Sequence, residues 1–326
     1  MQIERFPMPS KILVTGAGGM IGSHMAETLH QKGAAVQGTY YKPTVRLSEL
    51  NAEIPMRELD IRSFPDVCSV ICDLQPAVIY HFAAQSYPLV SLENPQETME
   101  TNVIGTVNLF EAVKSVRKKD SSYDPLILVA CSSAEYGESP YEDGRPEKET
   151  DALKPVHPYG VSKAAQDMIA YSYFLNDHIR CIRARIFNTT GIRKTGDVAS
   201  DLVRRTVLAE RSGNYEIALG NPDTRRAILD QRDTVNALLL LAEKGKCGEV
   251  YNVSSERLFS ARDLVRIIER EIGHRLILKT DPGLVRRVDE KQIAGDVGRL
   301  KKDTGWSQKI SMEETVKDML CYWRKH

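Results

Sequence analysis

The sequence predicts an α/β fold, a doubly wound parallel sheet with a smaller α/β cap on its C-terminal side. Short, continuously apolar segments alternate with amphipathic segments over residues 11–186. Strands that are apolar throughout are buried on both faces, as in a parallel sheet covered by helices. Beyond about residue 188 the segments become shorter and more polar. A chain of 326 residues is long enough for about two domains.

Each element of the larger unit has its own signal. The first strand reads KILVT, and Gly33 ends the helix that follows it. The second helix stops before Pro76, and the last begins at Pro158, a favoured first helical residue. We expect strands at Lys11–Thr15, Ala34–Tyr40, Val78–Ala83, Leu126–Cys131 and Ile179–Ile186, and helices at Met20–Lys32, Ser63–Leu74, Pro95–Lys118 and Pro158–Asn176.

The cap has weaker signals, and a polar, arginine-rich loop separates the first two helices after residue 188. We divide the chain into one unit of residues 10–188 and about 228–255, and a cap of residues 189–227 and about 256–326. In this part of the chain we expect helices at Val198–Glu210, Asp230–Glu243, Ala261–Ile272 and near Met312–Tyr322, and strands at Val250–Val253 and Arg275–Leu278.

Composition excludes several classes of function. Lys plus Arg and Asp plus Glu number 44 each, so the net charge is zero, which argues against a nucleic-acid or membrane-surface partner. No segment approaches the roughly 18 to 20 apolar residues of a membrane span. The first residues carry charges and prolines without a long apolar run, so we expect no secretory signal. The six scattered cysteines indicate reduced thiols in a cytoplasmic protein, and we expect no metal site.

A glycine-rich turn lies between the first strand and the first helix. It reads Thr15-Gly-Ala-Gly-Gly-Met-Ile-Gly22. Glycine is needed where the backbone turns tightly or approaches a pyrophosphate, and a helix start presents free N–H groups to phosphates. In this strand–turn–helix context the turn predicts a dinucleotide-binding, Rossmann-type sheet. The expected cofactor contacts are Gly16, Gly18, Gly19, Met20, Ile21 and Gly22.

The end of the second strand indicates which dinucleotide binds. An acid there would suit the ribose hydroxyls of NAD, and a basic residue the 2′-phosphate of NADP. The segment 39–42 has no acid, which favours NADP over NAD with Tyr40 and Lys42 as contacts. Lys42 could instead be a solvated surface charge. Asp60, with Ile61, is placed to contact the adenine, and a cap on the following helix is the alternative reading of Asp60.

Tyr159 and Lys163 are four residues apart in a predicted helix, so they share one face. Free tyrosine titrates near pH 10, and lowering its pKa to 7 requires about 4 kcal/mol of preferential stabilisation of the phenolate. A nearby ammonium and an oxidised nicotinamide ring could supply that stabilisation. Alone such a pair is more often an exposed helix face. Together with the glycine turn it predicts a general acid–base.

Ser132 directly follows an apolar strand and therefore lies at the crevice where the carboxyl ends of the strands meet. A hydroxyl at that position can hydrogen-bond the oxygen whose proton the tyrosine moves. A serine-rich turn that merely caps the next segment is the alternative.

Together these motifs resemble the extended short-chain dehydrogenase/reductases, the NAD-dependent epimerase/dehydratase family, over nearly the whole chain. Within it, segments 83–86 and 90–95 are most similar to GDP-mannose 4,6-dehydratases, and GDP-4-keto-6-deoxymannose reductases are close as well. The matching motifs are Thr15–Gly22, His81–Ser86, Asn102–Thr106, Tyr159–Lys163, Arg185–Asn188 and Gly295–Asp296 with Gly305–Trp306.

The resemblance implies a role for each matching position. Ser132, Tyr159 and Lys163 would be the catalytic set. Arg226 would bind the diphosphate of a nucleotide sugar, for which a guanidinium fork is suited, although each arginine could instead be a surface ion pair. The further cofactor contacts would be Phe82, Ala83, Ala84, Asn102 and Ile186, and the further substrate contacts Ser86, Ser133, Asn188, Arg193 and Arg286.

One departure from the family pattern bears on the reaction. Dehydratases of this family carry a glutamate two positions before the Tyr136-Gly pair, and this chain has Ala134 there. Glu135 is adjacent, but successive side chains of an extended segment point to opposite faces, so it would need a local irregularity to substitute. The change casts doubt on dehydration and leaves hydride transfer intact.

We therefore expect an enzyme that exchanges hydride between NAD(P) and C4 of a nucleotide-linked hexose. The resemblance implies that the nucleotide is GDP. It would act as a 4-keto reductase, C4 dehydrogenase or epimerase. The alternatives are a GDP-mannose 4,6-dehydratase and a non-catalytic NAD(P)-binding module. Relatives usually pair through the helices at Pro95–Lys118 and Pro158–Asn176, which implies a homodimer or homotetramer.

Overall fold

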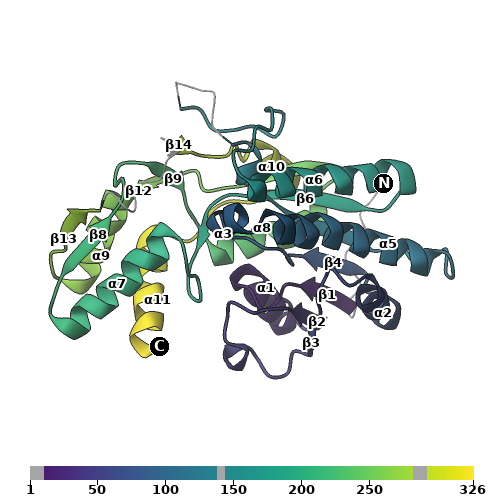
Figure 1. Ribbon diagram of the computed structural model, residues 1–326, viewed down its shortest axis with the longest axis horizontal. Helices are drawn as coiled ribbons and strands as arrows, with labels where there is room; N and C mark the ends of the chain where they lie inside the picture. Colours follow the sequence, from purple (N-terminus) through teal and green to yellow (C-terminus); the bar gives the residue numbers. More distant parts are fainter. Residues whose placement is uncertain (1–10, 138–143, 282–291) are drawn as a thin grey trace.

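The computed structural model describes residues 11–137, 144–281 and 292–326. Two lobes lie side by side (Figure 1): a large one built on the main sheet and a smaller one, at the left of the view, that contains α7, α9 and α11. No helix in these described ranges is long and apolar enough to cross a membrane.

The main sheet confirms the predicted doubly wound architecture. All its strands are parallel, in the order β11-β6-β5-β4-β1-β2-β3. In the register, Val14 of β1 lies between Gly38 of β2 and Tyr80 of β4. The strands are β1 Lys11–Thr15, β2 Ala35–Tyr40, β3 Met56–Glu58, β4 Val78–His81, β5 Leu126–Ser132, β6 Cys181–Ile186 and β11 Val250–Val253.

Helices cover both faces of this sheet. Alternate residues of each strand point to opposite faces, so Val14 and Leu128 pack on one helix layer and Leu13 and Ile127 on the other. The first layer contains α1 Met20–Gln31, α8 Gln231–Lys244 and α10 Gly298–Thr304, and the second contains α2 Phe64–Leu74, α5 Gly105–Arg117 and α6 Pro158–Asp177.

The predicted helix Pro95–Lys118 is not one regular helix. A π-helical turn, η2 Glu100–Ile104, separates α4 Pro95–Met99 from α5. A further short helix, α3 Pro88–Glu93, precedes it. The remaining short helices are η1 Leu47–Glu49 and η3 Ser133–Glu135. The apolar spacing alone carries no mark of these interruptions.

The smaller lobe has its own apolar core, formed by α7 Val198–Ser212, α9 Ala261–Ile272 and α11 Met312–Lys325. Its strands are two to four residues long and form small separate sheets: β8 Glu216–Leu219 with β13 Ile277–Thr280, and β9 Arg225–Ala227 between β12 Leu258–Ser260 and β14 Gln292–Ile293. A two-stranded pair links the lobes, β7 Thr189–Thr190 and β10 Leu229–Asp230.

The chain passes between the lobes more than once. After the cap strands β12 and β14, α10 returns to the large lobe, where Leu300 and Trp306 belong to the core beneath the main sheet. The sequence-based division instead places the whole of residues 256–326 in the cap. The last helix, α11, then packs in the cap core. Neither lobe is therefore one continuous stretch of chain.

Candidate active site

The glycine-rich turn has the geometry of a phosphate-binding loop. Gly16 has φ +70°, and a Cβ there would lie 2.7 Å from the backbone of Phe82 and Ala83. A Cβ on Gly22 would lie 2.3 Å from the carbonyl oxygen of Gly16, so larger residues cannot replace these glycines. No side chain caps the start of α1 at Gly19, which leaves the N–H groups of its first turn for an anion. This turn fits a dinucleotide pyrophosphate.

The residues predicted for the adenosine end carry charge partners. Lys42, which has φ 47°, is exposed and forms an ion pair of 3.1 Å with Glu97. Asp60 is bound by Arg62 at 2.7 Å and accepts the backbone N–H of Arg62. It does not cap α2, whose N-cap is Ser63. Tyr40 ends β2 beside this cluster, and Ile61 is buried against Gly105.

The loop after β4 is fixed by Asn102. Its amide accepts the N–H of Gln85 at 2.7 Å and donates to the Gln85 carbonyl at 3.0 Å and to Ser162 Oγ at 2.8 Å. These bonds give Asn102 a supporting position beneath the loop. On the same loop Phe82, Ala83 and Ala84 are half-buried and the side chain of Ser86 is exposed. Ile186, at the end of β6, is also half-buried.

Ser132, Tyr159 and Lys163 lie together at the carboxyl end of β5. The side chains of Ser132 and Tyr159 hydrogen-bond each other, and the Lys163 ammonium lies 6.0 Å from the centroid of the Tyr159 ring. The N–H of Tyr159 donates to Ser91 Oγ at 3.0 Å. His157 caps the start of α6 by accepting the Gly160 N–H. The bonds of Ser91 and His157 fix the backbone at the start of α6, which carries Tyr159.

Burial dominates the pKa values of this group. It raises the pKa of Tyr159 to about 12, an effect that the hydrogen bond with Ser132 partly offsets. It lowers the pKa of Lys163 to about 8. The side chains around Tyr159 therefore do not by themselves bring its pKa toward neutrality. The sequence-based expectation counts in addition on the positive ring of an oxidised nicotinamide.

Ala134 and Glu135 occupy the position where dehydratases need an acid. The local irregularity that could turn Glu135 inward exists, because Ser133–Glu135 form a 3₁₀ turn. It directs the carboxyl group into the protein, where Oε1 accepts the N–H of Ser132 at 2.8 Å and Oε2 lies 3.2 Å from Arg185. Glu135 is fully buried, whereas Ala134 is half-buried and has no proton to give.

The predicted substrate residues are dispersed. Ser133 adjoins the catalytic group and is half-buried, and the side chain of Asn188 is exposed at the end of β6. Arg226 lies on β9 in the cap. Arg193, with φ 66°, is bound by Glu27 at 2.8 Å and by the carbonyl oxygen of Glu49 at 3.0 Å. Arg286 lies outside the described residues.

Several supporting residues have no sequence signal that we used. Ser91 and Ser162 bond the backbone of Tyr159, and Gln166 bonds the Lys163 ammonium at 2.8 Å. The spacing of three residues between Lys163 and Gln166 places them on one helical face and could have indicated that pair. The serines could not be found, because short polar residues are common in loops and helices alike.

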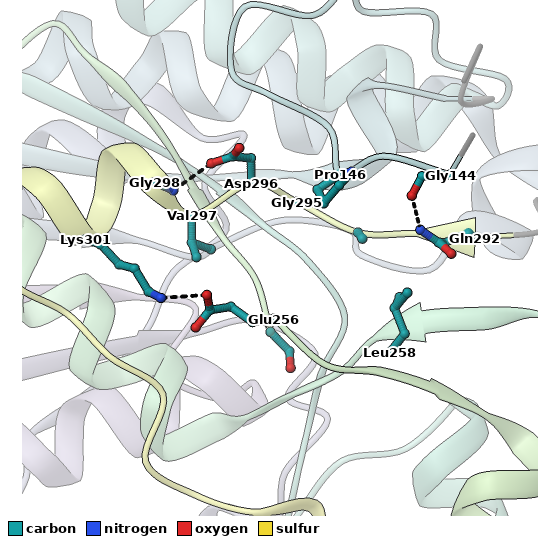
Figure 2. A pocket seen from close by; sticks show the side chains of 12 residues that line it. Gly144, Pro146, Glu256, Leu258, Gln292, Gly295, Asp296, Val297, Gly298 and Lys301 are labelled. Carbon is teal, nitrogen blue, oxygen red and sulfur yellow. Dashed lines mark hydrogen bonds and ion pairs between the residues drawn. The ribbon is translucent and has the colours of Figure 1, made fainter. Parts of the chain in front are cut away.

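A pocket of about 540 Å³ is lined by the residues that follow β11 and by residues of β12 and β14. Figure 2 shows Gly295, Asp296 and Val297 on one side of it, Leu258 of β12 on another, and the ion pair of Lys301 and Glu256 among the lining residues. Gly144 and Gln292 close one end through a hydrogen bond. The pocket adjoins the small sheet that carries Arg226.

Comparison with known proteins places the chain among nucleotide-sugar enzymes. The sequence profile described as GDP-mannose 4,6 dehydratase matches residues 13–319. A GDP-6-deoxy-D-mannose reductase of Pseudomonas aeruginosa is 26% identical over 318 residues, which cover 97% of this chain and 98% of that protein. A GDP-mannose 4,6-dehydratase of Yersinia enterocolitica is 24% identical, over 95% of this chain and 93% of that protein.

Solved structures are similar over the same extent. The RMD protein of Pseudomonas aeruginosa, solved with NADPH, has a TM-score of 0.80 at 25% identity and covers 97% of this chain and 99% of its own. A UDP-glucose 4-epimerase of Thermotoga maritima, solved with UDP-glucose, has a TM-score of 0.86 at 25% identity over the same shares. The fold and its two lobes are therefore those of these enzymes.

Proposed function

Because the chain belongs to the GDP-mannose 4,6-dehydratase family, we propose that it is an NAD(P)-dependent enzyme of C4 redox chemistry on a GDP-linked hexose. Reduction of a 4-keto sugar is the direction that its reductase relative favours. The proposal ranks the elimination of water second. The observation that carries it is the pair Ala134 and Glu135, which offers no acid to the crevice.

Three side chains perform the proton chemistry in this proposal. In reduction, C4 receives a hydride and Tyr159 gives its hydroxyl proton to the C4 oxygen, so that the ketone becomes an alcohol. Ser132 hydrogen-bonds the same oxygen, and the Lys163 ammonium stabilises the phenolate that remains. When bound, NAD(P) supplies the hydride. The glycine turn and the first turn of α1 would hold its pyrophosphate, and Lys163 its ribose.

Dehydration needs a further proton transfer at a second sugar carbon, and hence a second acid–base. Glu135 is the nearest candidate in the sequence, but both of its carboxyl oxygens face buried partners. To reach the crevice it would have to give up the Ser132 N–H and Arg185. A buried carboxyl group that loses its hydrogen-bond partners costs about 1–3 kcal/mol, so we assign Glu135 a supporting role.

Water elimination is the second candidate function, favoured by the family profile and the dehydratase relatives. The two reactions are separated by offering purified protein GDP-mannose with NADP⁺, and GDP-4-keto-6-deoxymannose with NADPH. We expect oxidation of NADPH at 340 nm only with the keto sugar. Conversion of GDP-mannose into a product 18 Da lighter would support dehydration. Cofactor binding without turnover or sugar-nucleotide binding would identify a non-catalytic module.

For the substrate we propose contacts from both lobes. Ser86, Ser133 and Asn188 follow the carboxyl ends of β4, β5 and β6, where a substrate would bind. Arg226 would meet the diphosphate from the cap. Arg286 keeps its proposed nucleotide contact on the resemblance alone. We do not extend the proposal to Arg193, because Glu27 and Glu49 hold its guanidinium group.

For the cofactor we propose NADP in preference to NAD. The end of β2 carries no carboxylate, and the carboxylate of Asp60 is held by Arg62. The side chain of Lys42 is 68% exposed, and its ion pair with Glu97 is at the surface, so a 2′-phosphate could compete for the ammonium. The NADPH bound to the similar Pseudomonas aeruginosa structure supports the same choice.

We also propose a homodimer or homotetramer formed through α5 and α6. Apolar side chains of α6 and of the turn before α5 are exposed, and clusters of this kind mark interfaces. Replacing Met168, which is 59% exposed, by glutamate should yield monomers in analytical ultracentrifugation. The exposed side chains are Ile104, Val161, Met168, Tyr171 and Leu175.

A cytoplasmic location is proposed from the free thiols of all six cysteines.

A further inference from the structure

The Lys163 ammonium is held by neutral groups. Its side chain is buried, with 4% of the residue exposed. Its Nζ donates to the carbonyl oxygen of Ala130 at 2.8 Å and to Oε1 of Gln166 at 2.8 Å. An ammonium has three donors, so one of them stays available toward Tyr159 and the crevice. Burial of a cation without a carboxylate partner is rare and costly.

Carboxylates are present nearby but are bound elsewhere. Asp167, one residue beyond Gln166, accepts from Arg183 at 2.5 Å and from Arg185 at 2.9 Å. Glu135 is held by the Ser132 N–H and by Arg185. Two guanidinium groups thus face two carboxyl groups, and the set has no excess of negative charge to offer Lys163.

The other titratable groups around Lys163 are uncharged. Burial lowers the pKa of His81 on β4 to about 3, so its imidazole is neutral. Burial also raises the pKa of the Cys131 thiol on β5. Burial and the charge of Asp167 raise the pKa of Glu135 to about 8. The remaining titratable neighbour of Lys163 is Tyr159, which lies on the same helix, α6. At neutral pH no described neighbour therefore cancels the charge of Lys163.

Gln166 lowers the stability of the protein at this position. Its Nε2 is buried and has no hydrogen-bond partner among the described residues. A buried, unsatisfied donor costs about 1–3 kcal/mol, and a methionine of similar length would avoid that cost. Since Lys163 has only donors, Oε1 must face it and Nε2 must point away. Stability alone does not explain an amide here.

We propose that Gln166 is a positioning residue that holds the Lys163 ammonium through a neutral oxygen, so that the charge stays uncompensated and acts on Tyr159. This inference rests on the proposed function, in which Tyr159 moves the proton. A carboxylate at position 166 would hold the ammonium equally well but would cancel its field at the phenol. An apolar side chain would leave the ammonium underbonded and favour its neutral form.

The test uses two substitutions with opposite predicted effects. In Gln166→Glu the alkaline pKa of the kcat/KM profile should rise by about one pH unit, because an anion stabilises the ammonium, while kcat at pH 7 falls about tenfold. In Gln166→Met the alkaline pKa should fall by a similar amount. A second readout is the ¹³Cε chemical shift of Lys163 in ε-¹³C-lysine-labelled protein, assigned with Lys163→Met.

Asn176→Asp is the matched control, since it adds the same charge at the exposed end of α6, and it should leave both readouts unchanged. Shifts in the same direction in both position-166 variants, or no change in the titration of Lys163, would overturn the proposal. The chemical-shift titration needs no substrate. If the enzyme activity is absent and the pKa of Lys163 still shifts in opposite directions in the two variants, the proposed function is wrong. The proposed role of Gln166 toward the Lys163 ammonium is then still supported.

Discussion

Two kinds of buried cation lie close together in this molecule. Arg183 and Arg185 on β6 face the carboxyl groups of Asp167 and Glu135 and are matched to them in number. Lys163 on α6 faces two neutral oxygens instead. The protein thus contains one cluster in which guanidinium groups are bonded to carboxyl groups and, close by, one ammonium that is bonded to neutral oxygens alone.

The contrast separates stability from chemistry. A matched guanidinium–carboxylate cluster fixes geometry, because each group would be costly to leave alone. Here it holds Glu135, and Glu135 in turn holds the N–H of Ser132. The unmatched ammonium contributes little to stability, but it provides a field at the phenol. Substitutions at Lys163 and Tyr159 should therefore lower activity, whereas substitutions in the arginine–carboxyl cluster should lower stability.

The largest effect is expected on the unmatched side. Tyr159→Phe and Lys163→Met should each lower kcat by about 10²–10⁴-fold, because each removes a member of the proton-transfer pair. Thermal unfolding should change little in either variant. Tyr171→Phe, which alters an exposed tyrosine of the same helix, is the control and should keep full activity. Loss of folding with loss of activity would contradict the contrast.

The matched side should show the reverse. Arg185→Met should lower the free energy of unfolding by about 3–5 kcal/mol, because it leaves two buried carboxyl groups without their shared partner. Urea titration measures this directly. Arg180→Met removes an exposed arginine paired with Asp124 at 2.8 Å and should cost less than about 1 kcal/mol. Equal losses in the two variants would mean that burial of the pair is unimportant.

A smaller effect is expected from His81, which is buried and neutral near Lys163. Its folded pKa of about 3 lies below the ordinary value of 6.5, so between these values the unfolded chain binds the extra proton. The contribution of His81 to stability should therefore rise as the pH increases from 3 to 6.5 and level off above it. The slope is about 1.4 kcal/mol per pH unit for one proton.

In His81→Gln the slope of stability against pH should decrease by about 1.4 kcal/mol per pH unit, the value for one proton. Urea titrations at pH 4.5, 5.5 and 7 measure the free energy of unfolding from which the slope is taken. His24, whose pKa burial lowers to about 4, is present in both proteins, so its contribution cancels in the comparison. An unchanged slope would show that His81 is protonated in the folded protein, and the ammonium of Lys163 would then have a charged neighbour.

The smallest effect concerns an exposed cation. Lys42→Ala should weaken NADPH binding by up to about fivefold, the range for a solvent-exposed charge pair, and leave NADH binding unchanged. Fluorescence titration of the two reduced cofactors measures the ratio. An equal loss for both would mean that Lys42 acts through Glu97 and the loop rather than through a 2′-phosphate.

The large lobe was predictable because its strands are apolar throughout and its helices are long. The predicted strands and helices of the main sheet mostly lie within two residues of those observed, whereas β3 was missed because Met56–Glu58 is only three residues long and half-exposed. In the cap, the predicted strand Arg275–Leu278 overlaps the observed β13, Ile277–Thr280. The strands β8, β9, β12 and β14 were missed because they are only two to four residues long. The π-helical turn at 100–104 carries Asn102, whose bonds with Gln85 of the loop after β4 are contacts that no local pattern contains.

Within the site, the residues that could be predicted are those whose spacing in the sequence is set by their proposed chemical roles. Tyr159, Lys163 and the glycine turn have a spacing that their proposed roles require, and the structure brings Ser132 to the same place. The partners of Arg193 could not be predicted, because Glu27 and Glu49 are more than 140 residues away in the chain. The inward direction of Glu135 likewise depends on a turn of three residues and on Arg185 across the sheet.

The repeated passage of the chain between the lobes affects how the protein comes apart. Tyr322 of α11 donates to Glu49 of the large lobe at 2.6 Å, and α10 and α11 belong to different cores although they are neighbours in sequence. Melting either core withdraws segments from the other, so heat should produce a single cooperative transition. A protease cut at one of the connecting segments should leave a nicked complex in place of two separable fragments.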